Sequence, residues 1–123
     1  MRGGGGARAL GQWGEDQVAE RLQAQGWRIV ARNFRCRMGE IDLIAEDGRY
    51  LAFVEVKLRK NGSYGAACEA VTLSKQRKLR LTAESYLLHR PTELQPRFDV
   101  AEVYAPQGVR TEQPDIYYIE NAF

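Results

Sequence analysis

The segment 39–60, GEIDLIAEDGRYLAFVEVKLRK, constrains the fold of this chain more than any other part of the sequence. Two apolar runs flank Asp47-Gly48, a dipeptide that accepts the positive φ angles of a type I′ turn. The segment therefore predicts a β-hairpin with Asp47 and Gly48 as its two loop residues. Both strands nevertheless carry charged side chains inside their apolar runs, and these charges need an explanation.

The predicted register decides which side chains share a face. Counting back from a two-residue loop places Asp42 opposite Phe53 and Glu40 opposite Glu55. Because side chains alternate along a strand, two faces follow. One face is apolar and is expected in the core: Ile41, Leu43, Ala45, Tyr50, Ala52, Val54 and Val56. The other face is apolar near the turn, at Ile44, Leu51 and Phe53, and then carries a charged cluster: Glu40, Asp42, Glu55 and Lys57.

The charged cluster predicts a metal site. Carboxylates about 4 Å apart repel by roughly 4 kcal/mol per pair at an effective dielectric near 20. Either their pKa values rise, or a cation lies between them. Carboxylate oxygens at this density suit Mg²⁺ or Mn²⁺, and Lys57 could hold a water or stabilise developing charge. The alternative is an edge-strand charge cluster that discourages aggregation.

The rest of the sequence predicts two helices and three more strands, which gives the order αβββαββ. The helices are expected at 10–25, ending at Gly26, and from the N-cap Thr72 to about Leu88. The strands are expected at 27–34, 97–105 and 115–120. This order indicates an α/β layered domain around a mixed sheet. A length of 123 residues suits one domain, expected at 10–123, with a flexible glycine-rich start at 1–9.

Composition argues for a soluble cytoplasmic protein without a membrane partner. No apolar run reaches the roughly 20 residues that span a bilayer, and the start MRGGGGARALG lacks the apolar stretch of a signal peptide. The two cysteines, Cys36 and Cys68, have no metal-type spacing and are expected as free or buried thiols.

Positive charge is distributed unevenly along the chain. One acid-free run contains Arg28, Arg32, Arg35 and Arg37. A second run, interrupted only by Glu69, contains Lys57, Arg59, Lys60, Lys75, Arg77, Lys78 and Arg80. Cations at the start of the second helix make sense if a phosphate lies at the helix N-terminus. The runs are compatible with a face that meets a polyanion such as DNA or RNA, or with solvated surface charge. The candidate nucleic-acid-binding residues are Arg35, Arg37, Arg59, Lys60, Tyr64, Lys75, Gln76 and Lys78.

The arrangement of Asp42 followed by Glu55-Val56-Lys57 resembles the PD-(D/E)xK signature of the restriction-endonuclease-like superfamily, which includes Holliday-junction resolvases. Ile41 stands where the signature has its proline. The segment GQWGEDQVAERLQAQGWRIVARNFRCRMGEIDLIAEDGRYLAFVEVKLR and the terminal AF resemble the YraN-like protein family, over nearly the whole chain from Leu10. This resemblance implies a restriction-endonuclease-like three-layer domain with a central mixed sheet flanked by helices.

Two acids outside the hairpin allow two interpretations each. Glu15 points along the buried stripe of the first helix, and in resolvase-like enzymes an acid there joins the metal cluster. A first-turn glutamate is also favoured by the helix dipole alone. Asp99 interrupts an apolar strand and could approach the acidic site, although an ion pair with Arg97 is the simpler explanation.

The sequence as a whole predicts metal-assisted phosphodiester hydrolysis in DNA, with branched or junction DNA as a candidate substrate. Asp42 and Glu55 would bind Mg²⁺ or Mn²⁺ together with the Val56 carbonyl, and Lys57 would orient water. Glu15 and Glu40 would be auxiliary ligands. The expected partners are DNA and a second copy of the chain in a homodimer. The alternative is a catalytically silent module that binds nucleic acid or another partner with the same fold.

Overall fold

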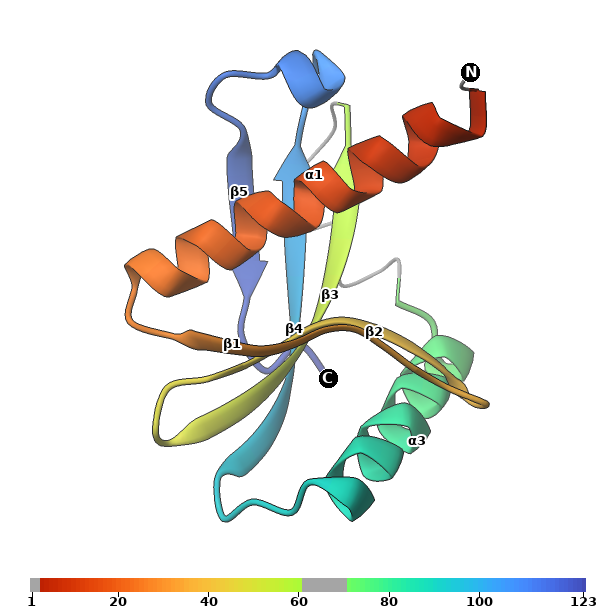
Figure 1. Cartoon of the computed structure of the whole chain (residues 1–123), viewed down its shortest axis with the longest axis vertical. Helices are drawn as coiled ribbons and strands as arrows, with labels where there is room; N and C mark the ends of the chain where they lie inside the picture. Colours follow the sequence, from red (N-terminus) through yellow and green to blue (C-terminus); the bar gives the residue numbers. More distant parts are fainter. Residues whose placement is uncertain (1–2, 61–70) are drawn as a thin grey trace.

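The structure, a computed structural model, describes residues 3–60 and 71–123. Its elements follow the predicted order αβββαββ, with one short 3₁₀ helix, η1, before the last strand (Figure 1). Their bounds are α1 Gly3–Ala24, β1 Arg28–Cys36, β2 Gly39–Glu46, β3 Tyr50–Arg59, α3 Leu73–His89, β4 Gln95–Tyr104, η1 Gly108–Arg110 and β5 Asp115–Ile119. The candidate nucleic-acid-binding residue Tyr64 lies outside the described residues, as does Cys68.

The five strands form one mixed sheet in the order β1-β2-β3-β4-β5. Strands β3 and β4 are parallel and are connected through α3, whereas the other neighbouring pairs are antiparallel. A parallel pair needs such a crossover connection. Helix α1 crosses the sheet on one side and α3 packs at β2 and β1 on the other (Figure 1). The result is a three-layer α/β domain consistent with a restriction-endonuclease-like fold, as predicted.

Each helix covers its own apolar cluster. The cluster under α1 contains Val18, Ala19, Leu22, Leu43, Ala45, Ala52, Val54, Ala101 and Val103. The cluster under α3 contains Ile41, Ile44, Leu51, Phe53, Val71, Leu79, Ala83, Tyr86 and Val100. Both faces of the hairpin are therefore buried near the turn. Ile41 was expected beside Leu43 but packs under α3, where it pairs with Phe34 of β1, whose side chain packs against the same cluster.

The predicted hairpin forms, but its predicted register is wrong by two residues. Ile44 pairs with Phe53, so Asp42 is not opposite Phe53 and Glu40 is not opposite Glu55. Oδ1 of Asp47 accepts hydrogen bonds from the backbone N–H groups of Arg49 and Tyr50, each 2.9 Å long. These bonds stabilise a turn longer than two residues. A shift by an even number of residues keeps every side chain on its face. Continuing the observed register sets Asp42 opposite Glu55.

Helix α1 begins at Gly3 rather than near Leu10, so the segment predicted to be flexible is helical from that residue on. The packed part of α1 supplies the nucleus, after which each added residue gains one backbone hydrogen bond without a new nucleation cost. The predicted stop at Gly26 is confirmed. Gly26 has φ +95°, its N–H donates to Gln23, and the N–H of Trp27 donates to Leu22, which is a Schellman motif.

Helix α3 begins as predicted after Thr72. The Thr72 hydroxyl accepts a 3.1 Å hydrogen bond from the backbone N–H of Lys75, which satisfies one of the otherwise unpaired donors of the first turn. This cap fixes where the helix starts. It therefore also fixes the position of Lys75 relative to β2 and β3.

Asp99 is fully buried on β4 and belongs to a structural ion pair rather than to the acidic site. Its carboxylate accepts hydrogen bonds from Arg97, from the Tyr118 hydroxyl at 2.6 Å and from the Asn121 N–H at 2.8 Å. Burial and this carboxylate raise the pKa of Tyr118. The simpler prediction for Asp99 is therefore confirmed, and the cluster holds β5 and the end of the chain against β4.

Among the described residues, neither helix is long and apolar enough to cross a membrane.

Candidate active site

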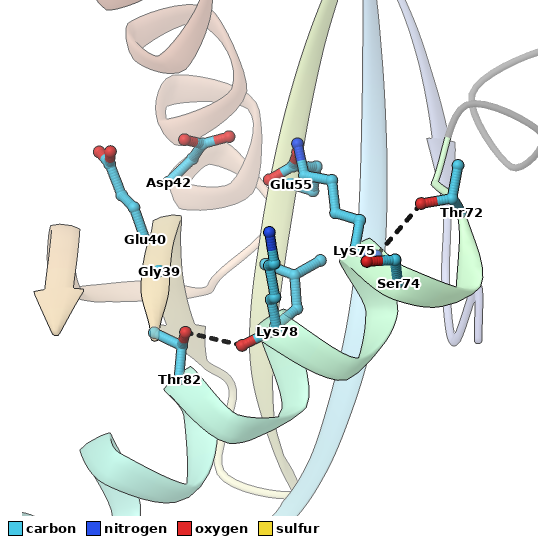
Figure 2. Close-up of a pocket in the computed structure, with 10 residues that line it drawn as sticks. Gly39, Glu40, Asp42, Glu55, Thr72, Ser74, Lys75, Lys78 and Thr82 are labelled. Carbon is cyan, nitrogen blue, oxygen red and sulfur yellow. Dashed lines mark hydrogen bonds and ion pairs between the residues drawn. The ribbon is translucent and has the colours of Figure 1, made fainter. Parts of the chain in front are cut away.

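The predicted carboxylates lie at a pocket of about 460 Å³ between β2, β3 and the first turns of α3 (Figure 2). In Figure 2, Glu40 and Asp42 rise from β2 on one side, and Lys75 and Lys78 extend from α3 on the other. The pocket is lined by Gly39, Glu40, Asp42, Glu55, Thr72, Ser74, Lys75, Lys78, Leu79 and Thr82. Acids thus form one wall, while hydroxyls and amines form the other.

Asp42 is held by the backbone of the neighbouring strand. Its Oδ2 accepts a 2.8 Å hydrogen bond from the N–H of Val56. Burial, followed by the negative charge of Glu55, raises the pKa of Asp42 to about 7, and the Val56 hydrogen bond opposes this rise. Glu15 and Glu40 add smaller repulsion in the same direction. The repulsion predicted for this cluster therefore contributes to the raised pKa of Asp42.

Glu55 is paired with two lysines at once. Its side chain is buried, with 6% of the residue exposed. Oε2 of Glu55 lies 3.2 Å from Nζ of Lys57 and 2.5 Å from Nζ of Lys75. Burial is the largest single influence on the pKa of Lys75 and lowers it, but the hydrogen bond to Glu55, the contact with Lys57 and the charges of Glu55 and Asp42 together raise this pKa. The sequence placed Lys57 beside Glu55 correctly, but it did not predict the contact with Lys75.

Asn33 links two further acids and was missed by the sequence analysis. Its side-chain amide nitrogen lies 3.1 Å from Oε1 of Glu15 and 3.1 Å from Oε2 of Glu40. Burial raises the pKa of Glu15, the Asn33 hydrogen bond lowers it, and the charge of Glu40 raises it again. Asn33 has φ +50°, a conformation that asparagine tolerates better than most residues. An asparagine inside a strand-like segment was the available signal.

A second, polar pocket of about 440 Å³ lies on the α1 side of this bridge. It is lined by Arg8, Gly11, Gln12, Glu15, Asn33, Arg35 and Glu40, so Glu40 borders both pockets. Helix α1 comes very close to β3 here. The close approach is possible because Gly14 has no side chain: a Cβ atom at this position would lie 2.8 Å from the Leu58 side chain. This close approach brings Glu15 to the acidic cluster, as the sequence predicted for its position.

Three of the candidate nucleic-acid-binding cations form ion pairs within the protein. Nε of Arg35 lies 3.4 Å from Glu40, and Nε of Arg59 lies 3.1 Å from the fully buried Glu102. Lys75 pairs with Glu55 as described above. The structure therefore does not present these three as one uniform basic strip. Arg59 in particular has a structural role inside the sheet.

The other candidates are divided between the pocket and the surface. Lys78 lines the pocket, whereas Arg37 and Lys60 are exposed. The Gln76 amide donates a 3.0 Å hydrogen bond to the carbonyl of Val71 and so braces the start of α3. Tyr64 lies outside the described residues.

The donor set of the pocket fits a hard divalent cation that also binds substrate. Mg²⁺ commonly takes one or two protein carboxylates, several waters and substrate phosphate oxygens. Asp42 and Glu55 supply the two carboxylates, and the pKa of Asp42 is raised first by burial and then by the charge of Glu55, a repulsion that a cation would relieve. Within 3–60 and 71–123, no group of three or more His, Cys, Asp or Glu side chains is arranged to hold a metal ion by itself.

Comparison with known proteins places the chain among bacterial relatives. The family described as "Uncharacterised protein family UPF0102" matches residues 14–103. The chain belongs to this family. This confirms the resemblance to the YraN-like family noted in the sequence. The matched range contains all four acids of the cluster and both lysines that contact Glu55.

Individual relatives in UPF0102 match over most of their length. A UPF0102 protein of Caldicellulosiruptor saccharolyticus is 44% identical over 117 residues, which cover 94% of this chain and 98% of the relative. One from Symbiobacterium thermophilum is 54% identical over 98 residues, covering 79% and 83%. One from Acinetobacter baumannii is 44% identical over 127 residues, covering 95% and 96%. The family thus extends over nearly the whole domain.

Proposed function

We propose that this chain is a metal-dependent nuclease that hydrolyses phosphodiester bonds in DNA, with branched DNA such as four-way junctions as the first substrate class to test. The observation that carries the proposal is that Asp42 and Glu55 line one pocket together with the amines of Lys75 and Lys78, while Lys57, which does not line the pocket, contacts Glu55. Carboxylates that suit Mg²⁺ or Mn²⁺ lie opposite cations that suit phosphate. Few other reaction classes need both.

Each residue has a defined task in this proposal. Asp42, Glu55 and the Val56 carbonyl would hold the metal, which would supply Lewis-acid polarisation of the phosphate and a more acidic water. Lys57 orients the attacking water and stabilises the negative charge that develops on the phosphate. Glu40 and Glu15 are auxiliary, since Asn33 holds their carboxylates beside the cluster.

Substrate binding rests on the α3 side of the pocket. Thr72, Ser74 and Lys78 line it at or near the N-terminus of α3, where backbone N–H groups and the helix dipole favour a phosphate. Lys60 and Arg37, which are exposed, are the candidate cations for DNA contacts outside the pocket. The proposal places the enzyme in the cytoplasm, acting as a single chain or as a homodimer.

The test is a cleavage screen with purified protein. End-labelled linear, flapped and four-way-junction DNA would be incubated with Mg²⁺ or Mn²⁺, and Asp42→Asn and Glu55→Gln proteins would be run in parallel. We expect metal-dependent products from the wild type and none from either variant. Equal product from the variants would assign the activity to a contaminant, and no product from any substrate with either metal would contradict the proposal.

A second candidate function has its own supporting observation. Lys57 and Lys75 already neutralise Glu55, and the described residues contain no ready three-ligand metal group. These facts favour a catalytically silent module that binds nucleic acid or another partner with the same fold. Such a module would bind DNA with a steep dependence on salt concentration, in the presence or absence of metal, and would cut none of the screened substrates.

A further inference from the structure

Lys75 lines the pocket from the first turn of α3 and contacts one of its acids. Its amine is 2.5 Å from Oε2 of Glu55, and its side chain remains 41% exposed. Lys57, the lysine of the signature motif, contacts the same oxygen from the same strand but is only 22% exposed. The more exposed side chain of Lys75 is therefore freer than that of Lys57 to move away from Glu55.

The location of Lys75 is unfavourable without a negative partner. Lys75 is in the first turn of α3, where the helix dipole disfavours cations. A buried carboxylate such as Glu55 is likewise unfavourable without a cation. In the structure, each of these two groups compensates for the charge of the other. A divalent ion at Glu55 would take over the role of Lys75 and would repel its amine.

We propose that Lys75 is a positioning residue that serves as the counter-ion of Glu55 in the metal-free protein and moves to a substrate phosphate when a divalent metal binds the carboxylates. This inference rests on the proposed nuclease function and assigns a step of regulation to the same site. The amine has a phosphate-binding environment within reach, because Thr72, Ser74 and Lys78 line the same pocket.

The proposal predicts effects of opposite sign on two ligands. Lys75 competes with the metal for Oε2 of Glu55 and adds positive charge beside it, so removing Lys75 should strengthen metal binding. Once metal is bound, Lys75 contributes one cation to the nucleic-acid-binding surface, so its removal should weaken binding of DNA. If Lys75 had a purely structural role, its removal would weaken the binding of both metal and DNA or would change the binding of neither.

Lys78 provides the matched control. It follows Lys75 by one helical turn and lines the same pocket, whereas in the described part of the chain the ion pairs of Glu55 are with Lys57 and Lys75. Lys78→Met therefore removes one cation of the pocket without removing the counter-ion of Glu55. Lys75→Arg keeps the charge and should keep the competition with metal.

The test measures Mn²⁺ affinity by titration calorimetry, and DNA affinity both with Mn²⁺ and in EDTA, for the wild type, Lys75→Met, Lys75→Arg and Lys78→Met. We expect Lys75→Met to bind Mn²⁺ about tenfold more tightly, the factor for losing one charge-assisted competitor, and to bind DNA several-fold more weakly with Mn²⁺ but like the wild type in EDTA. Lys78→Met should weaken DNA binding alone, and Lys75→Arg should bind Mn²⁺ like the wild type. Circular dichroism confirms that each variant is folded before it is compared.

Two results would overturn the inference, and they are distinguishable. If the wild type and Lys75→Met bind Mn²⁺ equally tightly, Lys75 is not a competitor and the nuclease proposal is untouched. If no protein in the series binds Mn²⁺, the metal site itself is wrong, and both proposals fail together. Binding of Mn²⁺ by Lys75→Met alone would support the inference, because the counter-ion would then be blocking the site in the wild type.

Discussion

Oδ2 of Asp42 accepts a 2.8 Å hydrogen bond from the backbone N–H of Val56, the residue between the acid and the lysine of the signature motif. This bond joins β2 to β3 just beyond the last pair of their ladder, Leu43 with Val54. A carboxylate therefore continues the strand pairing where the backbone ladder ends. The acid that the metal would use is positioned by the sheet itself.

Asp42 should make the stability of the metal-free protein depend on pH. Its pKa is about 7 in the folded protein and near 4 when unfolded, so between these values the native state binds more protons. Stability should therefore fall as pH rises through this window, by up to about 4 kcal/mol. Asp42→Asn should match the wild type near pH 4 and exceed it at pH 8, as measured by urea denaturation in EDTA.

Asp47 provides a control of opposite sign for this measurement. Hydrogen bonds from the N–H groups of Tyr50 and Arg49 lower the pKa of its carboxyl. The stabilisation from Asp47 is thus present above its unfolded pKa and is lost as pH falls through the folded pKa. Asp47→Ala should therefore lose more stability at pH 7 than at low pH. A parallel pH response of the Asp42 and Asp47 variants would refute the assignment of the Asp42 pKa.

Asn33 should keep Glu15 and Glu40 together. Asn33→Gly tolerates the φ of +50° but lacks the amide that bonds both carboxylates, whereas Asn33→Asp adds a third acid. We expect the free energy of unfolding to fall by about 1 to 2 kcal/mol in the glycine variant, and by more in the aspartate variant at pH 8. Chemical denaturation measures both. If Asn33→Asp were as stable as the wild type at pH 8, the acids would not be close enough to repel.

DNA binding should depend on exposed cations beside the pocket rather than on every cation of α3. Arg80 stacks over Phe98 and Phe123, at 5.1 and 5.6 Å, so reversing its charge would also disturb packing. Lys60→Glu with Lys78→Glu is the cleaner pair. The double variant should bind DNA more weakly, and the slope of log affinity against log salt concentration should become shallower by about 0.9 per lost phosphate contact. Arg110→Glu on η1 should change neither the affinity nor this slope. An equal effect of Arg110→Glu would mean that only net charge matters.

The terminal Phe123 should stabilise the domain through an aromatic stack. Its ring lies 5.1 Å from Phe98, which in turn lies 5.5 Å from Phe53 in the cluster under α3. Phe123→Ala should lower the free energy of unfolding by about 1 to 3 kcal/mol, and Phe123→Leu by less, because leucine retains part of the buried apolar area. Thermal and urea denaturation of both variants measure the difference. No loss in Phe123→Ala would show that the stack adds nothing to stability.

The elements were predictable because each has a strong local signal. Thr72 caps α3 and Gly26 ends α1 through hydrogen bonds that depend on residues close in sequence. The face shared by Asp42, Glu55 and Lys57 was also predictable, because strand alternation survives a register shift of two residues.

The contacts between distant elements were not predictable in the same way. The pairing of Lys75 with Glu55 requires the packing of α3 against the sheet, and the Asn33 bridge requires a positive φ inside β1. The longer hairpin turn depends on the Asp47 side chain, which outweighed the preference of Asp-Gly for a two-residue loop. Each of these features is set by tertiary or side-chain geometry that composition and periodicity do not encode.

The rate of DNA cleavage by Lys57→Ala under single-turnover conditions tests the central claim most directly. Lys57 lies 3.2 Å from Glu55 and is assigned to charge that develops only during attack on the phosphodiester. For whichever DNA the wild type cuts with Mg²⁺, Lys57→Ala should cut about 10² to 10³ times more slowly while binding that DNA with nearly unchanged affinity. Lys57→Arg should restore the rate only in part. Cleavage by Lys57→Ala at the wild-type rate would contradict the account.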